Sequence, residues 1–363
     1  MKYSLREKVV IAAVFAVFFC VYLANIAPAI NSDDSPETVI ACHTLGVQHP
    51  PGYPLIAMLG KVFIQLPAGS VMFRVNLMSA FFNVLAGLLL FFMVSGFFSG
   101  RKTYERMFIG FTAAAIYMFS ATAWLQASTA KGGIYTLNSL LTLICFWAIF
   151  NIKKSIRYFY LFGFIWGVSM GNHWTSTAAI APAFLLYLFF RRRLITPGQA
   201  GIAAVFFLAG ASVYLFAVIR TLGGAAYGWG EIRSVQDLFW LITRAQYAGI
   251  EVKHTLGDTL NLLSYHIRNF FLKETPLLAG LLFIPGVWRA LKTRRDEAAA
   301  LLAAYVMIVL SVASVATPPP NTEWLIKPYL VSSMIYAAFF AAFFAAFVTE
   351  RIKRHSTAAA ASV

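Results

Sequence analysis

Long uncharged segments recur along the chain and set its hydrophobic pattern. Crossing about 30 Å of hydrocarbon takes roughly 20 residues at 1.5 Å per helical residue. We therefore expect an all-α polytopic membrane protein of about ten transmembrane helices. The runs that predict them lie near residues 9–30, 75–98, 107–126, 132–151, 158–172, 174–190, 199–219, 276–290, 298–316 and 328–349.

One of these runs is too long for a single crossing. Residues 158–190 carry no charge over 33 positions, and Gly171, Asn172 and His173 interrupt the run near its middle. A polar break between two apolar arms is typical of a helical hairpin whose turn lies at the membrane surface. We therefore expect two helices in this run, joined at residues 171–173.

The first and eighth segments need separate treatment. The apolar run 9–30 exceeds the core of a usual signal peptide, so we expect a retained anchor. Small residues at 27–29 leave a cleavage site as the alternative. The eighth run is short and contains Pro276 and Pro285, but without it the basic residues after position 350 would face the wrong side.

Composition explains why lipid, and not water, must surround most of the chain. Of the 363 residues, 60% are hydrophobic and 12% are charged. Ordinary soluble domains carry about 25% charged residues. A single soluble core cannot hide so much apolar surface.

Basic residues give the predicted orientation. Of the 29 Lys and Arg residues, 19 fall in six short segments that this topology places on one side, together with five acidic residues. Because cytoplasmic segments carry such an excess, both termini are expected in the cytoplasm. The net charge of +15 therefore gives no argument for nucleic acid as a partner. The six segments are residues 1–8, 99–106, 152–157, 191–193, 289–297 and 350–354.

The pattern divides the chain into one membrane domain and a short tail. Residues 1–355 are expected to form a single domain with two long outer segments, 31–74 and 220–275. The Ala-rich residues 356–363 are expected to be disordered. Two of the three cysteines, Cys20 and Cys145, lie inside predicted helices, so we expect no disulfide framework.

The first outer segment begins with an acidic cluster. Asp33, Asp34 and Glu37 directly follow the first helix, and Pro36 and Gly46 bound a predicted interfacial helix. Capping explains part of the cluster, with Asp34 as the N-cap and Glu37 completing a capping box. Capping does not explain Asp33. Because dense negative charge at a membrane surface is costly, we favour a functional role for the cluster in addition to capping.

A rigid turn follows the predicted interfacial helix. Three prolines and Gly52 stiffen and bend the backbone, which would fix His49 and Tyr53 in space. A plain re-entry loop is the alternative interpretation. His49 and the acidic cluster also offer ligands for a divalent cation such as Mg²⁺ or Mn²⁺, and metal binding stays open.

Three strings of the chain are specific enough to compare with known families. They are Asp34-Ser35-Pro36-Glu37, His49-Pro50-Pro51-Gly52-Tyr53-Pro54-Leu55 and Arg74-Val75-Asn76-Leu77-Met78-Ser79-Ala80. They resemble the transmembrane-protein-260-like family, which includes protein O-mannosyltransferases and many bacterial proteins. Looser matches lie at residues 134–138, 171–175, 229–230 and 244–247.

This resemblance implies a membrane glycosyltransferase with the GT-C fold, in which an acidic residue of the first outer loop lies at the active site. Such an enzyme moves a sugar, with mannose as one candidate, from a polyprenyl-phosphate carrier to a protein or glycan acceptor outside the cytoplasm. An acceptor hydroxyl needs a general base, for which Asp34 is the first candidate, Asp33 the second and Glu37 the third. Direct displacement would invert the anomeric carbon.

The departing lipid phosphate needs cationic or hydrogen-bonding partners. Arg74, at the outer start of the second helix, is the leading candidate. Lys131, Arg220 and Arg244 also lie at outer helix ends, with snorkelling to the interface as the alternative role. The remaining candidates for substrate binding are His49, Tyr53, Tyr135, Asn172, His173, Trp229 and Tyr247.

The second outer segment has two interpretations. Mixed aromatic and charged residues around 235–247 and 256–271 suit interfacial helices that lie against lipid headgroups. The alternative is a lid over the substrates, with Trp229 or Tyr247 stacking on a sugar ring.

One position departs from the family pattern. Where relatives often carry an acidic residue before the Tyr-Thr-Leu string, this chain has Gly132 and Gly133 behind Lys131. Three functions therefore stay open: glycosyl transfer, transport or flipping of a lipid-linked substrate, and an inactive scaffold subunit. Transporters place ionisable residues near the bilayer midplane. Here nearly all charges lie at helix ends or in loops, so we prefer transfer, at a bacterial inner membrane.

Overall fold

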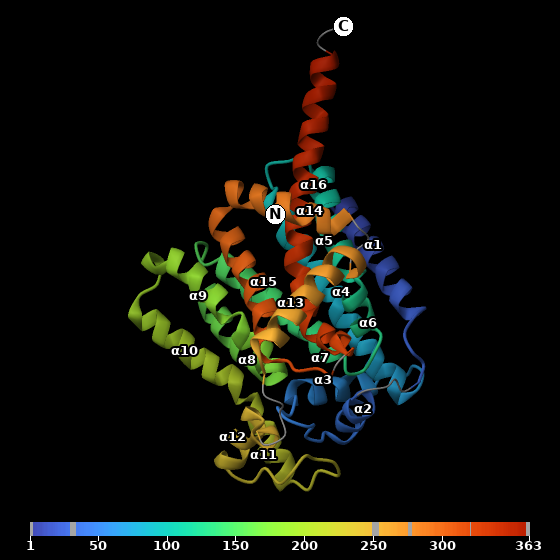
Figure 1. Ribbon diagram of the computed structural model, residues 1–363, viewed down its shortest axis with the longest axis vertical. Coiled ribbons are helices and arrows are strands. Elements are labelled where there is room, and N and C mark those ends of the chain that lie inside the picture. The colour runs from blue at the N-terminus through green and yellow to red at the C-terminus, as the bar shows by residue number, and fades with distance from the viewer. Residues whose placement is uncertain (1–2, 30–33, 249–253, 275–277, 320, 361–363) are drawn as a thin grey trace.

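The computed structural model is a bundle of helices (Figure 1). It describes residues 3–29, 34–248, 254–274, 278–319 and 321–360. Within these ranges no β-strand occurs, and one isolated parallel bridge joins Val47 to Gly228. The expected all-α polytopic membrane architecture is confirmed.

Five helical runs within the described ranges are long and apolar enough to cross a membrane, or up to seven if each of two bent pairs is one span. Three of the five are single helices: α4 (Val71–Phe97), α7 (Gly133–Phe150) and α15 (Arg295–Val315). The other two are α10 (Pro197–Ala211) with η2 (Ser212–Tyr214) and α11 (Leu215–Leu222), and η5 (Glu323–Leu330) with α16 (Val331–Ala360). The bent pairs are α5 (Thr103–Met118) with α6 (Ala121–Ala127) and α8 (Arg157–Ala179) with α9 (Ala181–Phe190).

Helices also occupy the two remaining predicted segments, α1 (Leu5–Leu23) in the first and α14 (Leu278–Thr293) in the eighth. At the far end, α16 continues to Ala360, into the segment that the sequence assigns to a tail. The shorter elements are α2 (Ser35–Thr44), α3 (Pro54–Ile64), η1 (Arg192–Leu194), α12 (Val235–Thr243), η3 (Ala245–Tyr247), α13 (Leu256–Asn269) and η4 (Phe270–Glu274).

The predicted single helix at 107–126 is wrong in one respect, because the chain bends there. α5 and α6 meet at an angle of 70°. Ser120, between them, has extended dihedrals (φ −64°, ψ 145°) that end the helix. Distant side chains then form hydrogen bonds with the backbone groups left free where α5 ends and α6 begins. Tyr22 donates to the Met118 carbonyl, and Glu274 accepts from the Thr122 amide at 2.8 Å.

The long uncharged run folds back on itself, as expected. His173 has non-helical dihedrals (φ −145°, ψ 81°), so one break falls inside the predicted turn. A second bend, of 79°, lies at Ile180 between α8 and α9, where the prediction had a continuous helix. Behind α9, Arg191 forms an ion pair of 2.5 Å with Asp296 at the start of α15. The chain then enters α10, which runs parallel to α8, so both arms of the hairpin have their open ends on the same side of the bundle.

Glycines bring α8 and α10 into backbone contact. A Cβ atom on Gly167 would lie 2.0 Å from the Phe207 carbonyl oxygen, and one on Gly163 would lie 2.4 Å from that of Ala203. Small residues are how membrane helices approach this closely without a hydrophobic driving force. The pairing holds the hairpin turn, and thus His173, in place.

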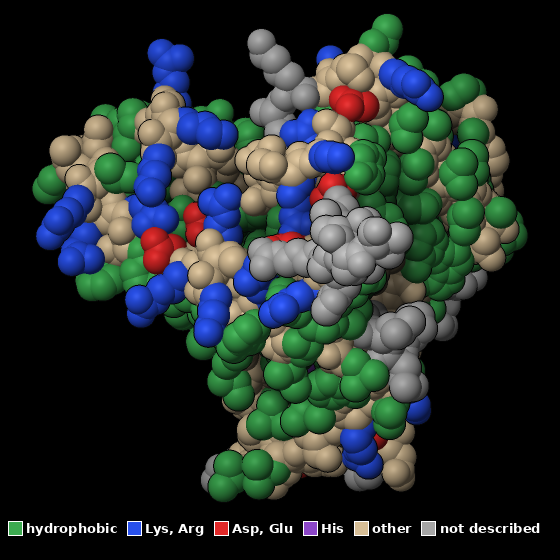
Figure 2. All heavy atoms as spheres, turned by 90° about the horizontal axis from the view of Figure 1, so that it is seen from above, with side chains coloured by type: hydrophobic (Ala, Val, Ile, Leu, Met, Phe, Trp, Pro, Cys, Tyr) green, Lys and Arg blue, Asp and Glu red, His purple; other side chains and the backbone are tan. Residues whose placement is uncertain are grey.

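The two ends of the bundle differ. The basic end, defined by Arg101, Arg191 and Arg289, lies at the top of Figure 1, where α16 leaves the bundle. Figure 2 shows Lys and Arg side chains gathered over this end with a few acidic ones between them. The loop end, defined by α2, α3 and α12, lies at the bottom of Figure 1.

We predict that Gly167→Ala lowers the thermal stability of the protein in detergent, because the new methyl group meets the Phe207 backbone. Gly201→Ala is the matched control on α10, where an added Cβ finds nothing within 4 Å. Alanine favours an open helix by about 1 kcal/mol over glycine, so this variant should be neutral or slightly stabilised. Equal melting temperatures for the two variants would contradict the packing account.

Candidate functional site

The start of α2 carries the two acidic residues of the first outer segment that the structure describes, Asp34 and Glu37. Asp34 stands at the N-cap position, but its side chain makes no capping hydrogen bond. Glu37 forms no capping box either, because both of its oxygens contact His49. The capping interpretation of these side chains is therefore wrong, and the carboxylates serve a different cluster. Asp33 lies outside the described residues.

Glu37 and His49 form the centre of this cluster. The His49 backbone amide donates to Glu37 Oε1 at 2.7 Å, and His49 Nδ1 pairs with Oε2. Burial acts to raise the pKa of Glu37, but the hydrogen bonds from His49 and Tyr227 outweigh it and hold the pKa below its ordinary value. Glu37 is thus ionised at neutral pH and fastens the proline-rich turn to α2.

The second outer segment passes over the first. The Val47 amide donates to the Tyr227 carbonyl at 3.3 Å, and the Trp229 amide donates to the Val47 carbonyl at 3.1 Å. The Tyr227 hydroxyl then donates to Glu37 Oε1 at 3.1 Å. A Cβ on Gly46 would lie 2.6 Å from the Tyr227 carbonyl oxygen, so this close crossing requires glycine there.

The helix predicted near residues 256–271 forms and packs against the bundle. α13 covers this stretch and packs along α15, where His266 Nε2 lies 3.1 Å from the Tyr305 hydroxyl. One face of α13 is therefore packed against the bundle, and its contact with headgroups stays a prediction. Its buried Leu262, His266 and Asn269 face the bundle because they share one side of the helix.

Asp34 meets a cation from another part of the chain. The Lys131 ammonium, just before α7, donates to Asp34 Oδ2, and His49 Nε2 lies 3.9 Å from the same oxygen. The side chain of Asp34 is 42% exposed, against 15% for Glu37. Between Asp34 and Glu37, Asp34 is therefore the carboxylate that an incoming molecule can reach more easily.

Three buried rings and the half-buried Tyr329 form an aromatic wall beside the cluster. Tyr53 lies 5.4 Å from the His49 ring and stacks on His173 at 6.1 Å between centroids. Tyr135 and Tyr329 each lie 5.6 Å from His173. Asn172 is turned away, since its amide donates to the Ile134 carbonyl at 2.7 Å. The sequence did not predict Tyr329, on η5, as part of this wall. It is far along the chain from the other wall residues, and no local motif marks it.

Several predicted phosphate-binding residues have other partners. Arg74 donates to the carbonyls of Ile64, Leu66 and Ser70 and so completes the end of α3. Arg220 donates to the Leu45 carbonyl at 2.8 Å and closes α2 in the same way. Neither of these hydrogen-bonding sets reaches the acidic cluster.

Arg244 and Tyr247 lie beside each other near the aromatic wall. The Arg244 guanidinium carbon is 4.9 Å from the centre of the Tyr247 ring. Burial raises the pKa of Tyr53 well above its ordinary value, and the positive charge of Arg244 opposes this rise. Arg244 is therefore close enough to act electrostatically on the wall.

Of the two glycines that depart from the family pattern, Gly132 leaves no room for a side chain and Gly133 leaves little. A Cβ on Gly132 would lie 1.7 Å from the Gln126 carbonyl oxygen. One on Gly133 would lie 2.9 Å from Ser79 Oγ. The neighbouring Lys131 reaches Asp34 instead, so this position brings a positive charge to the cluster where the pattern implies a negative one.

Asp34, Glu37 and His49 together offer a donor set for a metal ion. One possible ligand atom from each lies within 4.8 Å of the others. Two carboxylates with one imidazole suit Mn²⁺ better than Mg²⁺, which prefers oxygen alone. In this arrangement, however, Lys131 takes Asp34 Oδ2 and His49 takes both oxygens of Glu37. An ion would have to displace these contacts.

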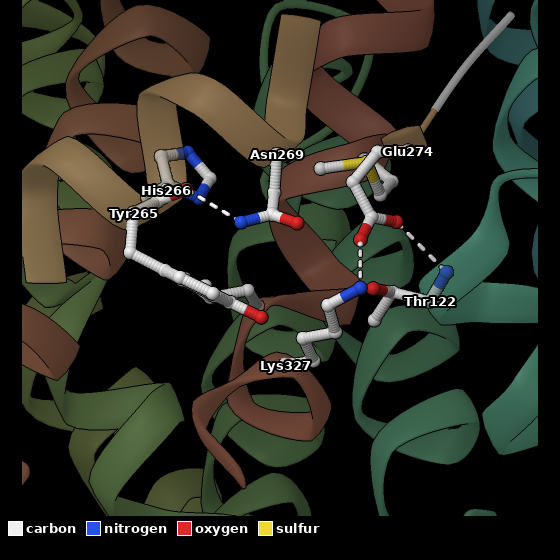
Figure 3. A pocket seen from close by; sticks show the side chains of 8 residues that line it. Thr122, Tyr265, His266, Asn269, Glu274 and Lys327 are labelled. Atoms are coloured by element: carbon white, nitrogen blue, oxygen red, sulfur yellow. Dashed lines mark hydrogen bonds and ion pairs between the residues drawn. The ribbon is translucent and has the colours of Figure 1, made fainter. Parts of the chain in front are cut away.

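A second polar cluster was missed from the sequence (Figure 3). Glu274, on η4, is buried, and its carboxylate accepts from the Thr122 amide and pairs with Lys327 at 3.2 Å. Tyr265 and Asn269 of α13 line the same cavity. The ion pair ties η4 to η5, the segment that carries Tyr329, and the hydrogen bond from Thr122 ties η4 to α6.

The fold is similar to that of a solved protein. The chain superposes on ArnT from Cupriavidus metallidurans bound to undecaprenyl phosphate, with a TM-score of 0.66 and 13% identity over 99% of this chain and 64% of that one. The same protein in the apo state gives a TM-score of 0.59 over 93% of this chain and 59% of that one, also at 13% identity. The chain thus has an ArnT-like fold of the GT-C type.

The sequence is similar to one family. Residues 34–196, which are less than half of the chain, match the model of the protein O-mannosyl-transferase TMEM260 N-terminal domain. The mouse protein O-mannosyl-transferase TMEM260 is 28% identical over 69% of this chain and 36% of its own length. The protein of the same name from Dictyostelium discoideum is 22% identical over 75% and 35%. The chain therefore spans about a third of the length of these relatives.

We predict that Glu37→Gln releases the second outer segment from the first. A hydrogen bond to a charged group contributes about 1.5–3 kcal/mol, so amide exchange of residues 225–230 should become about tenfold faster or more. Hydrogen exchange with mass spectrometry measures this. Glu231→Gln, at an exposed position of the same segment, is the control and should leave exchange unchanged.

The same contact should depend on pH. Because the pKa of Glu37 is lowered on folding, its contribution is present above the unfolded value of about 4.3 and is lost as pH falls through the lower, folded value. Protection of residues 225–230 should therefore survive at pH 5 and decline only below the ordinary pKa of glutamate, about pH 4. Loss of protection between pH 7 and 5 would contradict the assignment.

Proposed function

We propose that the chain is a membrane glycosyltransferase that moves a sugar from a polyprenyl-phosphate carrier to a protein or glycan acceptor at its loop end. Mannose is the first candidate for the sugar. One observation carries the proposal: an exposed carboxylate, Asp34, lies beside a lysine at the loop end of an ArnT-like fold. The family name of the relatives supports the same chemistry.

Asp34 is the proposed general base. An acceptor hydroxyl must lose its proton as it attacks the anomeric carbon, and a positioned carboxylate takes that proton. Exposure of Asp34 lets the acceptor reach it, while Glu37 is held by His49 and Tyr227 and positions the turn. A single displacement of this kind inverts the anomeric configuration.

Lys131 is the proposed partner of the departing phosphate. Its ammonium lies against Asp34 and is partly exposed, so it is available to a phosphate that enters beside this carboxylate. When the lipid phosphate draws the ammonium to itself, Asp34 Oδ2 is released from Lys131 and can accept the proton of the acceptor hydroxyl. Binding of the donor would thus free the base.

Trp229 is the proposed contact for the sugar. Its side chain is 40% exposed, its ring lies 6.2 Å from that of His49, and its indole nitrogen donates to the Tyr227 hydroxyl at 3.2 Å. A ring held in this way offers a flat apolar face on which a sugar stacks. This supports the interpretation of the second outer segment as a cover.

The proposed topology has ten crossings, with both termini in the cytoplasm and the acidic cluster outside. The basic end, which carries the excess of Lys and Arg, would face the cytoplasm of a bacterial inner membrane. Reporter fusions after Arg193 and within residues 250–260 should then report opposite sides. A result on the same side would remove the proposal that the loop end is extracytoplasmic.

We predict that Asp34→Asn lowers sugar transfer about 10²- to 10⁴-fold, the usual contribution of a general base. The assay is transfer from a polyprenyl-phosphate sugar to acceptor by the protein in proteoliposomes. Glu231→Gln removes an exposed charge from the same end and should retain transfer. Equal transfer by wild type and Asp34→Asn would eliminate the mechanism. Transport of the lipid-linked sugar without transfer would favour a flippase, and neither activity an inactive scaffold.

We predict that Lys131→Gln weakens donor binding. Loss of a charged hydrogen bond to phosphate costs about 1.5–3 kcal/mol, so the donor KM should rise about tenfold or more. Arg233→Gln, an exposed cation at the loop end, is the control and should leave the donor KM unchanged. A Lys131→Gln variant with the donor KM of wild type would assign this lysine to structure alone.

A further inference from the structure

The basic end contains a cavity that glycosyl transfer at the loop end does not use. It encloses about 310 Å³ between the ends of α4, α14 and α16. The side chains that line it are mainly of two kinds, arginine and phenylalanine. Six of them carry the argument: Arg101, Arg289, Arg294, Phe97, Phe98 and Phe347.

The positive charge of this cavity exceeds the negative charge within it. Glu350 Oε2 pairs with two guanidinium groups, those of Arg101 and Arg289, each at 3.2 Å. Glu105 lies 3.8 Å from Arg101, so two carboxylates face three arginines. Arg294 instead donates to the Phe97 carbonyl at 3.1 Å. The side chains of Arg101 and Arg289 are 20% and 29% exposed, so their mutual repulsion is only partly screened by water.

Aromatic rings hold the arginines in a fixed arrangement. The guanidinium carbon of Arg101 lies 5.5 Å from the Phe98 centroid, that of Arg289 lies 5.2 Å from Phe347, and that of Arg294 lies 5.5 Å from Phe97. Because these contacts already order the arginine side chains, little side-chain entropy is lost when a ligand binds. The planar guanidinium groups stay available as donors to an oxygen anion.

We propose that this cavity binds the phosphodiester headgroup of an anionic membrane lipid. Guanidinium groups bind phosphate oxygens with two parallel hydrogen bonds, and basic pockets between helix ends are typical headgroup sites. The phenylalanine walls suit the glycerol and upper acyl carbons of a lipid and would disfavour a fully hydrated free phosphate. The bound lipid would tie α14 to α4 and α16. This inference does not depend on the proposed transfer reaction.

The test compares lipids and variants in nanodiscs. The full chain is reconstituted in phosphatidylcholine alone and in equal parts of phosphatidylcholine and phosphatidylglycerol, and the lipid that stays bound is counted by native mass spectrometry after extraction. We expect phosphatidylglycerol to be retained and to raise the thermal unfolding temperature. Retention should fall to the level of phosphatidylcholine in the double variant Arg289→Gln and Arg294→Gln.

Two further variants keep the test decisive. Ala346→Leu fills the cavity without changing its charge and should abolish retention as well. Lys153→Gln with Lys154→Gln removes the same charge from exposed positions in a segment of the basic end and should leave retention intact. Retention by Ala346→Leu, or equal losses in both double variants, would overturn the site. Inorganic phosphate that gives the full stabilisation in phosphatidylcholine alone would overturn the assignment to a lipid.

Discussion

The carboxylate of Glu37 joins three parts of the loop end: α2, the turn at His49 and the second outer segment through Tyr227. These contacts are strong because they are charged and largely shielded from water. With the turn fixed, the ring of His49 stands beside Asp34, and Tyr53 closes on the wall around His173. The arrangement of the proposed site therefore depends on this one side chain.

A division of roles between the two described carboxylates follows from their surroundings. Glu37 has hydrogen-bonding partners on both oxygens and holds the scaffold. Asp34 is more exposed and has Lys131 as its closest cation. Paired carboxylates in different environments take different tasks, because each environment sets the protonation and the access of its own group. In the proposed mechanism, Lys131 is the member of the Asp34–Lys131 ion pair that moves when the donor binds.

The sequence predicted the helical segments and the acidic cluster, because hydropathy and charge are local properties. It predicted the break at Gly171 to His173 for the same reason. It failed where a distant residue decides the outcome: the bend at Ser120, completed by Tyr22 and Glu274, and the end of α3, completed by Arg74. Tyr329 and Glu274 belong to the same class, since only the fold brings them beside Tyr135 and Thr122.

The most direct measurement is an experimental structure of the protein with a polyprenyl phosphate bound. The account predicts the phosphate at the loop end, with the Lys131 ammonium within hydrogen-bonding distance and withdrawn from Asp34. It also predicts that the His49 to Glu37 contact is retained. A phosphate bound only among the arginines of the basic end, with the pair of Asp34 and Lys131 unchanged, would contradict the account.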